Sequence, residues 1–176
     1  MRITKDIPYG PNGMHLDLYA PDQDGFDTLI WFHGGGFEAG SRRDAEPLAE
    51  SVTALGLGFA SVEYRMFPSA RFPDFLLDAA WSVAFLQKHG QDCGCGGRFV
   101  ISGQSAGAYI TMMLALNGAL LHNAGVDETS ILAYVSESSQ QTTHYNMLRQ
   151  RGIDSRAERI DEEAPLYYVG QRPLTK

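Results

Sequence analysis

The amino-acid sequence predicts an α/β fold, in which a mostly parallel sheet carries helices on both faces. Apolar runs rich in β-branched residues alternate along the chain with segments of helical periodicity, which is the order of a parallel sheet. Two of these runs lead directly into glycine-rich turns, at 33–36 and at 103–107. The chain has 176 residues, enough for one domain with its own core, so we expect 1–176 to form a single α/β domain.

Each expected element follows from a local pattern. The expected strands are apolar or alternate apolar with polar residues, and they are bounded by turn formers. They lie at residues 14–19, 28–32, 58–64, 98–104 and 131–136. The expected helices carry apolar residues on one face, and Pro73 and Gly90 mark the start and the end of one of them. They lie at residues 45–55, 73–89 and 106–121.

The sequence Gly-Gln-Ser-Ala-Gly at 103–107 stands between an apolar strand and a helical segment. This order predicts a tight turn with Ser105 at its apex, where the backbone is strained and the hydroxyl lies above the sheet. Larger side chains in place of the two glycines would clash, and the start of the next helix adds a positive electrostatic end. Ser105 is therefore the candidate nucleophile, and an ordinary Gly/Ser-rich loop is the alternative.

A second glycine-rich segment, His-Gly-Gly-Gly-Phe at 33–37, follows another apolar strand. Consecutive glycines allow backbone amides to turn toward an anion. Acyl transfer needs such donors where the negatively charged oxygen of its tetrahedral intermediate develops. We expect the amides of Gly35 and Gly36 to supply them, with Ala106 as a third donor. A flexible linker is the alternative, but linkers do not usually begin at the end of a buried strand.

These motifs occur with others in the order and rough spacing of α/β-hydrolase esterases. The motifs are His33–Phe37, Glu63-Tyr64-Arg65 with Pro68, Phe72-Pro73 with Asp78, and Gly103–Gly107. From about Met14 onward the chain resembles the hormone-sensitive-lipase-like and acetyl-esterase branch of that fold, truncated after about the sixth strand. The resemblance implies a serine hydrolase scaffold that cleaves small or short-chain carboxylic esters through an acyl-enzyme. It also implies that Tyr64, Arg65 and Asp78 support the site without reacting. His33, next to Gly34, is itself expected to hydrogen-bond within the loop and hold its shape.

The histidine base and the carboxylate that such a serine needs are missing from their usual places. They follow the serine in the order acid, then histidine, and the family places them after the seventh and eighth strands. The seventh strand is expected to start only at 172–176. Within the chain, His144 is the candidate base and Glu137 the candidate acid, while His122 lies about 25 Å along the helix from Ser105.

Two other functions stay open. An arylformamidase-like amidase combines the same glycine loop and serine motif without a large cap. A catalytically inactive hydrolase fragment or binding module would keep the scaffold and lack the base. The truncation would also leave the strand at 131–136 as an open apolar edge, so we expect self-association or a complementing C-terminal segment.

The composition of the chain argues against several classes of binding partner. The net charge of −7 argues against nucleic acid and anionic membranes, and no run approaches the roughly 20 apolar residues of a membrane span. Residues 1–6 do not resemble a signal peptide, so a cytoplasmic location is the expectation. Cys93 and Cys95 could hold half a metal site, but no second ligand pair accompanies them. We therefore expect a small-molecule ester substrate and neither a metal nor a cofactor.

Overall fold

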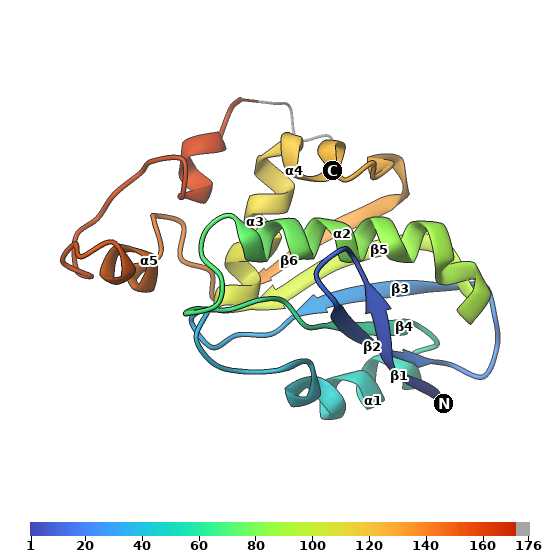
Figure 1. Ribbon diagram of the computed structural model, residues 1–176. Helices are drawn as coiled ribbons and strands as arrows, with labels where there is room; N and C mark the ends of the chain where they lie inside the picture. The colour runs from blue at the N-terminus through green and yellow to red at the C-terminus, as the bar shows by residue number, and fades with distance from the viewer. Residues whose placement is uncertain (172–176) are drawn as a thin grey trace.

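Six strands form one sheet in the order β1-β2-β4-β3-β5-β6 in the computed structural model, which describes residues 1–171 (Figure 1). β3, β4, β5 and β6 run parallel to one another, and β1 and β2 pair antiparallel at one edge. The mostly parallel sheet expected from the sequence is thus confirmed. The strands are β1 (Arg2–Tyr9), β2 (Met14–Ala20), β3 (Phe26–Phe32), β4 (Gly58–Val62), β5 (Cys95–Gln104) and β6 (Ile131–Glu137).

Helices cover both faces of the sheet. α1 packs on one face over a cluster that includes Trp31 and Phe59, whereas α2 and α3 cover the larger core on the other face (Figure 1). The helices are α1 (Glu46–Ala54), α2 (Asp74–His89), α3 (Ala106–Leu116), α4 (Gly118–Asn123) and α5 (Tyr145–Gln150). Short 3-10 turns lie at Arg42–Ala45, Gly90–Cys93, Glu128–Ser130 and Pro165–Tyr168. None of the helices within residues 1–171 has the length and apolar character needed to span a bilayer.

Two elements differ from expectation. β1 was not predicted, because an edge strand needs few apolar residues and most of its side chains are exposed. The helix expected to reach residue 121 ends instead at Leu116. Asn117 leaves the helical conformation and its side chain accepts a hydrogen bond from the Ala119 amide, so a new helix, α4, starts there. The expected start of a seventh strand, at 172–176, lies outside the described residues.

The parallel strands bring their carboxyl ends to one edge of the sheet. In the register of the sheet, Phe32 of β3 pairs with Gly103 of β5, and Gln104 pairs with Glu137 of β6. β5 therefore ends between two neighbours, and the segments that follow β3, β5 and β6 meet at this edge. Open parallel sheets bind their ligands at such an edge.

Candidate active site

The turn between β5 and α3 has a strained residue at its apex. Ser105 has φ 55° and ψ −113°, a left-handed conformation that residues with a side chain rarely adopt. Its amide donates a hydrogen bond of 2.9 Å to the carbonyl oxygen of Glu137, and its carbonyl accepts one of 2.9 Å from the Tyr109 amide. The strained conformation is thus held from both sides, by the end of β6 and by the first turn of α3.

The two glycines of the turn are required by close backbone approach. A Cβ built on Gly103 would lie 2.4 Å from the carbonyl carbon and oxygen of Gly107. A Cβ on Gly107 would lie only 1.9 Å from the carbonyl oxygen of Phe32, at the end of the neighbouring strand β3. Both contacts are with backbone, which cannot move aside as a flexible side chain can. This explains why glycine stands two residues before and two residues after Ser105.

The glycine loop after β3 lies directly against this turn and presents two amides without internal acceptors. A Cβ built on Gly34 would lie 3.3 Å from Ser105 Cβ. The Gly34 carbonyl accepts a hydrogen bond from His33 Nδ1 at 2.7 Å, and the Gly35 carbonyl accepts from two amides that follow it, at 3.0 and 3.1 Å. Because N–H and C=O point in opposite directions across a trans peptide, the Gly35 and Gly36 amides point away from these bonds. Within residues 1–171 neither amide donates a hydrogen bond.

Ala106 is the first residue of α3. The amide of a first helical residue has no partner inside the helix. Its position, directly after Ser105, is the one expected from the sequence for a third donor. Ala106 itself is fully buried, so its side chain takes no part in the surface of the site.

His33 is a fixed part of the glycine loop. Its ring stacks on Tyr64 with the centroids 4.3 Å apart, and the Tyr64 hydroxyl donates to the His33 carbonyl at 2.7 Å. Its Nε2 lies 3.1 Å from Glu63 Oε1. Burial alone would raise the pKa of Glu63, but hydrogen bonds with His33 and Arg42 and their charges hold that pKa below its usual value. The buried ring therefore orients the loop through a carboxylate that stays ionised at neutral pH.

Glu63 is held in turn by residues that were not expected from the sequence. Arg42 contacts Glu63 Oε2 at 3.4 Å and donates a 3.0 Å hydrogen bond to Asp17, a fully buried carboxylate on β2. The second oxygen of Asp17 has no hydrogen-bond partner within residues 1–171. Gly40, also missed, has φ +93°, and a Cβ there would lie 2.5 Å from the Gly34 carbonyl oxygen. Two features of the sequence could have indicated these residues: Asp17 is a charged residue inside an alternating strand, and Gly40 is one more glycine after the loop.

Arg65 and Asp78 connect the end of β4 to α2. The Arg65 guanidinium donates to both carboxylate oxygens of the buried Asp78, at 2.8 and 2.9 Å, and the Arg65 amide adds a bond of 3.0 Å. Asn12 donates to the same carboxylate at 3.3 Å. Within residues 1–171 the hydrogen bonds to this carboxylate come from Arg65 and Asn12, so Asp78 connects α2 to the end of β4 and to the turn between β1 and β2.

The candidate acid and the candidate base lie in different environments, one exposed and the other buried. Glu137 ends β6, and it meets the turn through its backbone, while its side chain is exposed. His144 is buried between the rings of Phe37 and Tyr145, and its Nδ1 accepts the Asn146 amide at 3.2 Å. Burial lowers the pKa of His144 to about 4, although Glu38 nearby acts in the opposite direction. Within residues 1–171 no hydrogen bond joins His144 to Ser105.

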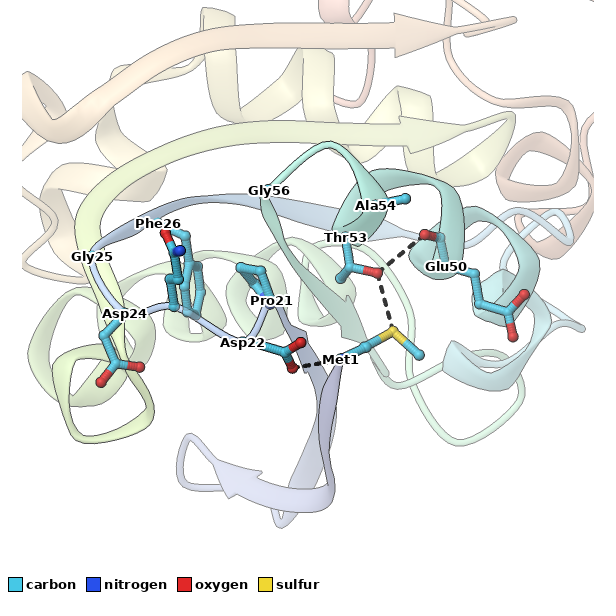
Figure 2. Close-up of a pocket in the computed structure, with 11 residues that line it drawn as sticks. Met1, Pro21, Asp22, Asp24, Gly25, Phe26, Glu50, Thr53, Ala54 and Gly56 are labelled. Carbon is cyan, nitrogen blue, oxygen red and sulfur yellow. Dashed lines mark hydrogen bonds and ion pairs between the residues drawn. The ribbon is translucent and has the colours of Figure 1, made fainter.

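Two cavities lie at opposite ends of the sheet. One, of about 310 Å³, lies beside the glycine loop and is lined by residues that include Trp31, Gly35 and Gln104. The other, of about 630 Å³, lies where β3 and β4 begin, between Phe26 and Thr53 (Figure 2). Only the first adjoins the segments that meet at the carboxyl ends of the strands.

Comparison with known proteins agrees with this architecture. The BD-FAE family model matches residues 16–153. Over 118 residues the chain is 32% identical to esterase LipI of Mycobacterium tuberculosis, and over 93 residues it is 34% identical to human hormone-sensitive lipase. These matches cover 64% and 52% of this chain, but only 37% and 9% of the two relatives. The chain thus spans well under half the length of either relative.

Solved structures show the same fold. A bacterial heroin esterase superposes with a TM-score of 0.67 and 23% identity, over 93% of this chain and 56% of that enzyme. The six strands within residues 1–171 therefore share the fold of that structure, and in this chain the serine turn follows β5 and the glycine loop follows β3. The chain belongs to the BD-FAE family, within the hormone-sensitive-lipase-like α/β-hydrolase esterases.

Proposed function

We propose that this chain carries the nucleophile and the oxyanion donors of a hydrolase that cleaves small or short-chain carboxylic esters. The observation that carries the proposal is the strained Ser105 apex packed against a loop whose Gly35 and Gly36 amides have no acceptor among residues 1–171. Strain of this kind persists only where the surrounding structure maintains it, and it gathers at functional sites. A cavity of about 310 Å³ adjoins the loop and is lined by Gly34, Gly35 and Gln104, the residue before Ser105.

The chemistry follows from these groups. Ser105 Oγ attacks the ester carbonyl carbon, its proton passes to a base, and the C=O π electrons move onto the oxygen. The amides of Gly35, Gly36 and Ala106 donate to that oxyanion, and one such donor typically contributes about 2.7–4 kcal/mol to the transition state. Collapse of the intermediate expels the alcohol, which takes the proton. Water then repeats the sequence on the acyl-enzyme and releases the acid.

The proposed reaction also needs a histidine base and a carboxylate that orients it. Within the chain the candidates stay His144 and Glu137. The Nδ1 lone pair of His144 is used by a backbone amide and its ring is buried, which favours a structural role. We therefore propose that a complementing segment supplies a histidine and a carboxylate to Ser105.

A fluorophosphonate probe tests the nucleophile. It should label Ser105, with the modified residue identified by peptide mass spectrometry, and Ser105→Ala should abolish the label. Ser130→Ala, which changes a serine near the start of β6, is the matched control and should label normally. Absence of labelling in the chain and in a longer polypeptide that carries it would overturn the proposal and leave the inactive-scaffold alternative. Faster turnover of N-formylkynurenine than of p-nitrophenyl acetate would instead favour the amidase.

We also propose that β6 mediates association. Within residues 1–171 it pairs only with β5, and its Leu132 and Val135 side chains are 41% and 51% exposed. Exposed apolar side chains on an outer strand of a sheet favour contact with another chain. Light scattering should show a concentration-dependent dimer that Val135→Lys weakens. A monomer at all concentrations would contradict association through this edge.

A further inference from the structure

The short helix α5 packs against the glycine loop, although about 110 residues separate them in sequence. Asn146 Nδ2 donates a hydrogen bond of 2.9 Å to the carbonyl oxygen of Gly36. On the next turn, Arg149 forms an ion pair with Glu38, and Gln150 donates to the same carboxylate at 3.2 Å. α5 is therefore attached to the loop by a buried hydrogen bond and by contacts nearer the surface.

The contact with Gly36 is close and shielded. Gly36 has φ +64°, and a Cβ built there would lie 2.6 Å from Asn146 Nδ2. Asn146 is only 9% exposed, so water does not compete freely for the Gly36 carbonyl. The asparagine amide thus occupies the space that a side chain on residue 36 would need.

The orientation of the Asn146 amide is set by its neighbours. Its Oδ1 accepts from Arg149 Nε and a terminal guanidinium nitrogen at 3.4 and 3.3 Å, which leaves Nδ2 to face Gly36. Its backbone amide donates to His144 Nδ1 at 3.2 Å, which fixes the start of α5. The Asn146 side chain that donates to the loop is therefore oriented by contacts at both ends of α5, with His144 and with Arg149.

We infer that Asn146 is a positioning residue for the oxyanion donors. The Gly35 carbonyl is held from within the loop, and Asn146 holds the next carbonyl, that of Gly36. Together these bonds fix the peptide planes on either side of Gly36, and with them the direction of its amide. This inference rests on the proposed function, and it assigns to the segment after β6 a part in shaping the transition-state site.

The substitution Asn146→Asp tests this, because aspartate keeps the size and the Arg149 contact but cannot donate to Gly36. Asn117→Asp is the matched control, since the same change at the start of α4 keeps an effective helix cap. Two measurements are made on each variant: the inactivation rate constant of Ser105 with a fluorophosphonate, and hydrogen exchange of peptides covering residues 33–40. Exchange of α2 peptides and the thermal midpoint verify folding.

We expect Asn146→Asp to lower the inactivation rate constant about tenfold or more with little change in probe affinity, and to speed exchange at 33–40. Asn117→Asp should change neither. Unchanged loop exchange in folded Asn146→Asp, or equal effects of both variants, would overturn the inference. If neither the unmodified chain nor a longer polypeptide that carries it labels, the proposed function fails, and the exchange result still decides whether Asn146 orders the loop.

Discussion

The amide of Ser105 donates a 2.9 Å hydrogen bond to the carbonyl oxygen of Glu137. This bond joins the strained turn after β5 to the last residue of the neighbouring strand β6. It continues the pairing of Gln104 with Glu137 by one residue, beyond the end of β5. The unusual backbone of Ser105 is therefore maintained by the sheet, and the strain can be measured.

Replacing Ser105 by glycine should stabilise the protein relative to alanine. Both variants remove the hydroxyl, but only glycine adopts φ 55° without a steric penalty. We expect Ser105→Gly to unfold at higher urea concentration than Ser105→Ala, by roughly 1 kcal/mol. Equal midpoints would mean that the turn relaxes when its serine is removed.

Gly107→Ala should destabilise the protein although Gly107 lies in a helix. Alanine normally stabilises a helix interior relative to glycine by roughly 0.5–1 kcal/mol. Here the new methyl group would lie 1.9 Å from the Phe32 carbonyl oxygen, so we expect a loss of roughly 3 kcal/mol or more. Urea denaturation measures this loss. Gly13→Ala, at φ +67° with open space around it, should cost distinctly less, and the opposite order would contradict the close packing.

Asp78→Asn should lower the free energy of unfolding because it leaves the Arg65 guanidinium without its carboxylate. Breaking a buried pair costs about 3–5 kcal/mol, and we expect roughly 2–4 kcal/mol because Arg65 reaches solvent. Denaturant titration provides the measurement. Asp154→Asn, in an exposed ion pair with Arg156, should leave the midpoint unchanged. Similar losses in both variants would exclude a supporting role specific to Asp78.

His144 should make the protein less stable in mild acid. Its pKa is lowered to about 4 by burial, against about 6.5 for an unfolded histidine. As the pH falls from about 6.5 to about 4, the unfolded chain therefore binds the proton first, and stability declines by up to about 3 kcal/mol. His144→Asn, which can still cap α5, should flatten the pH dependence in this window, whereas the exposed His122→Asn should not. Parallel curves for all three proteins would contradict a neutral, buried His144.

The parts of the fold that depend on local rules were predictable from the sequence. The turn at 103–107 and the loop at 33–37 were readable because only glycine tolerates the backbone approach found there. β4, β6 and the start of α2 were also expected close to where they lie, because apolar runs, Pro73 and flanking glycines mark them. The parallel sheet followed from the alternation of such segments.

The contacts that shape the loop were not predictable in this way. Arg42 reaches Asp17 and Glu63 across segments 21 to 25 residues apart, and Asn146 meets Gly36 across 110 residues. No local pattern encodes such pairs, because they depend on how strand ends and later loops come together. The surroundings of the candidate base were also not predictable, because the burial of His144 and its bond to the Asn146 amide arise only in the folded chain.

Arg42 also reaches the first strand, where it pairs with the Asp6 carboxylate, in addition to Asp17 on β2 and Glu63 at the end of β4. The amino-terminal hairpin, remote in sequence from Ser105, is thus coupled to the histidine that orders the glycine loop. A shortened variant that begins at Met14 would lose the Asp6 contact and leave Arg42 with Asp17 and Glu63 alone. We therefore expect an engineered minimal scaffold to hold the glycine loop more firmly when it retains the hairpin.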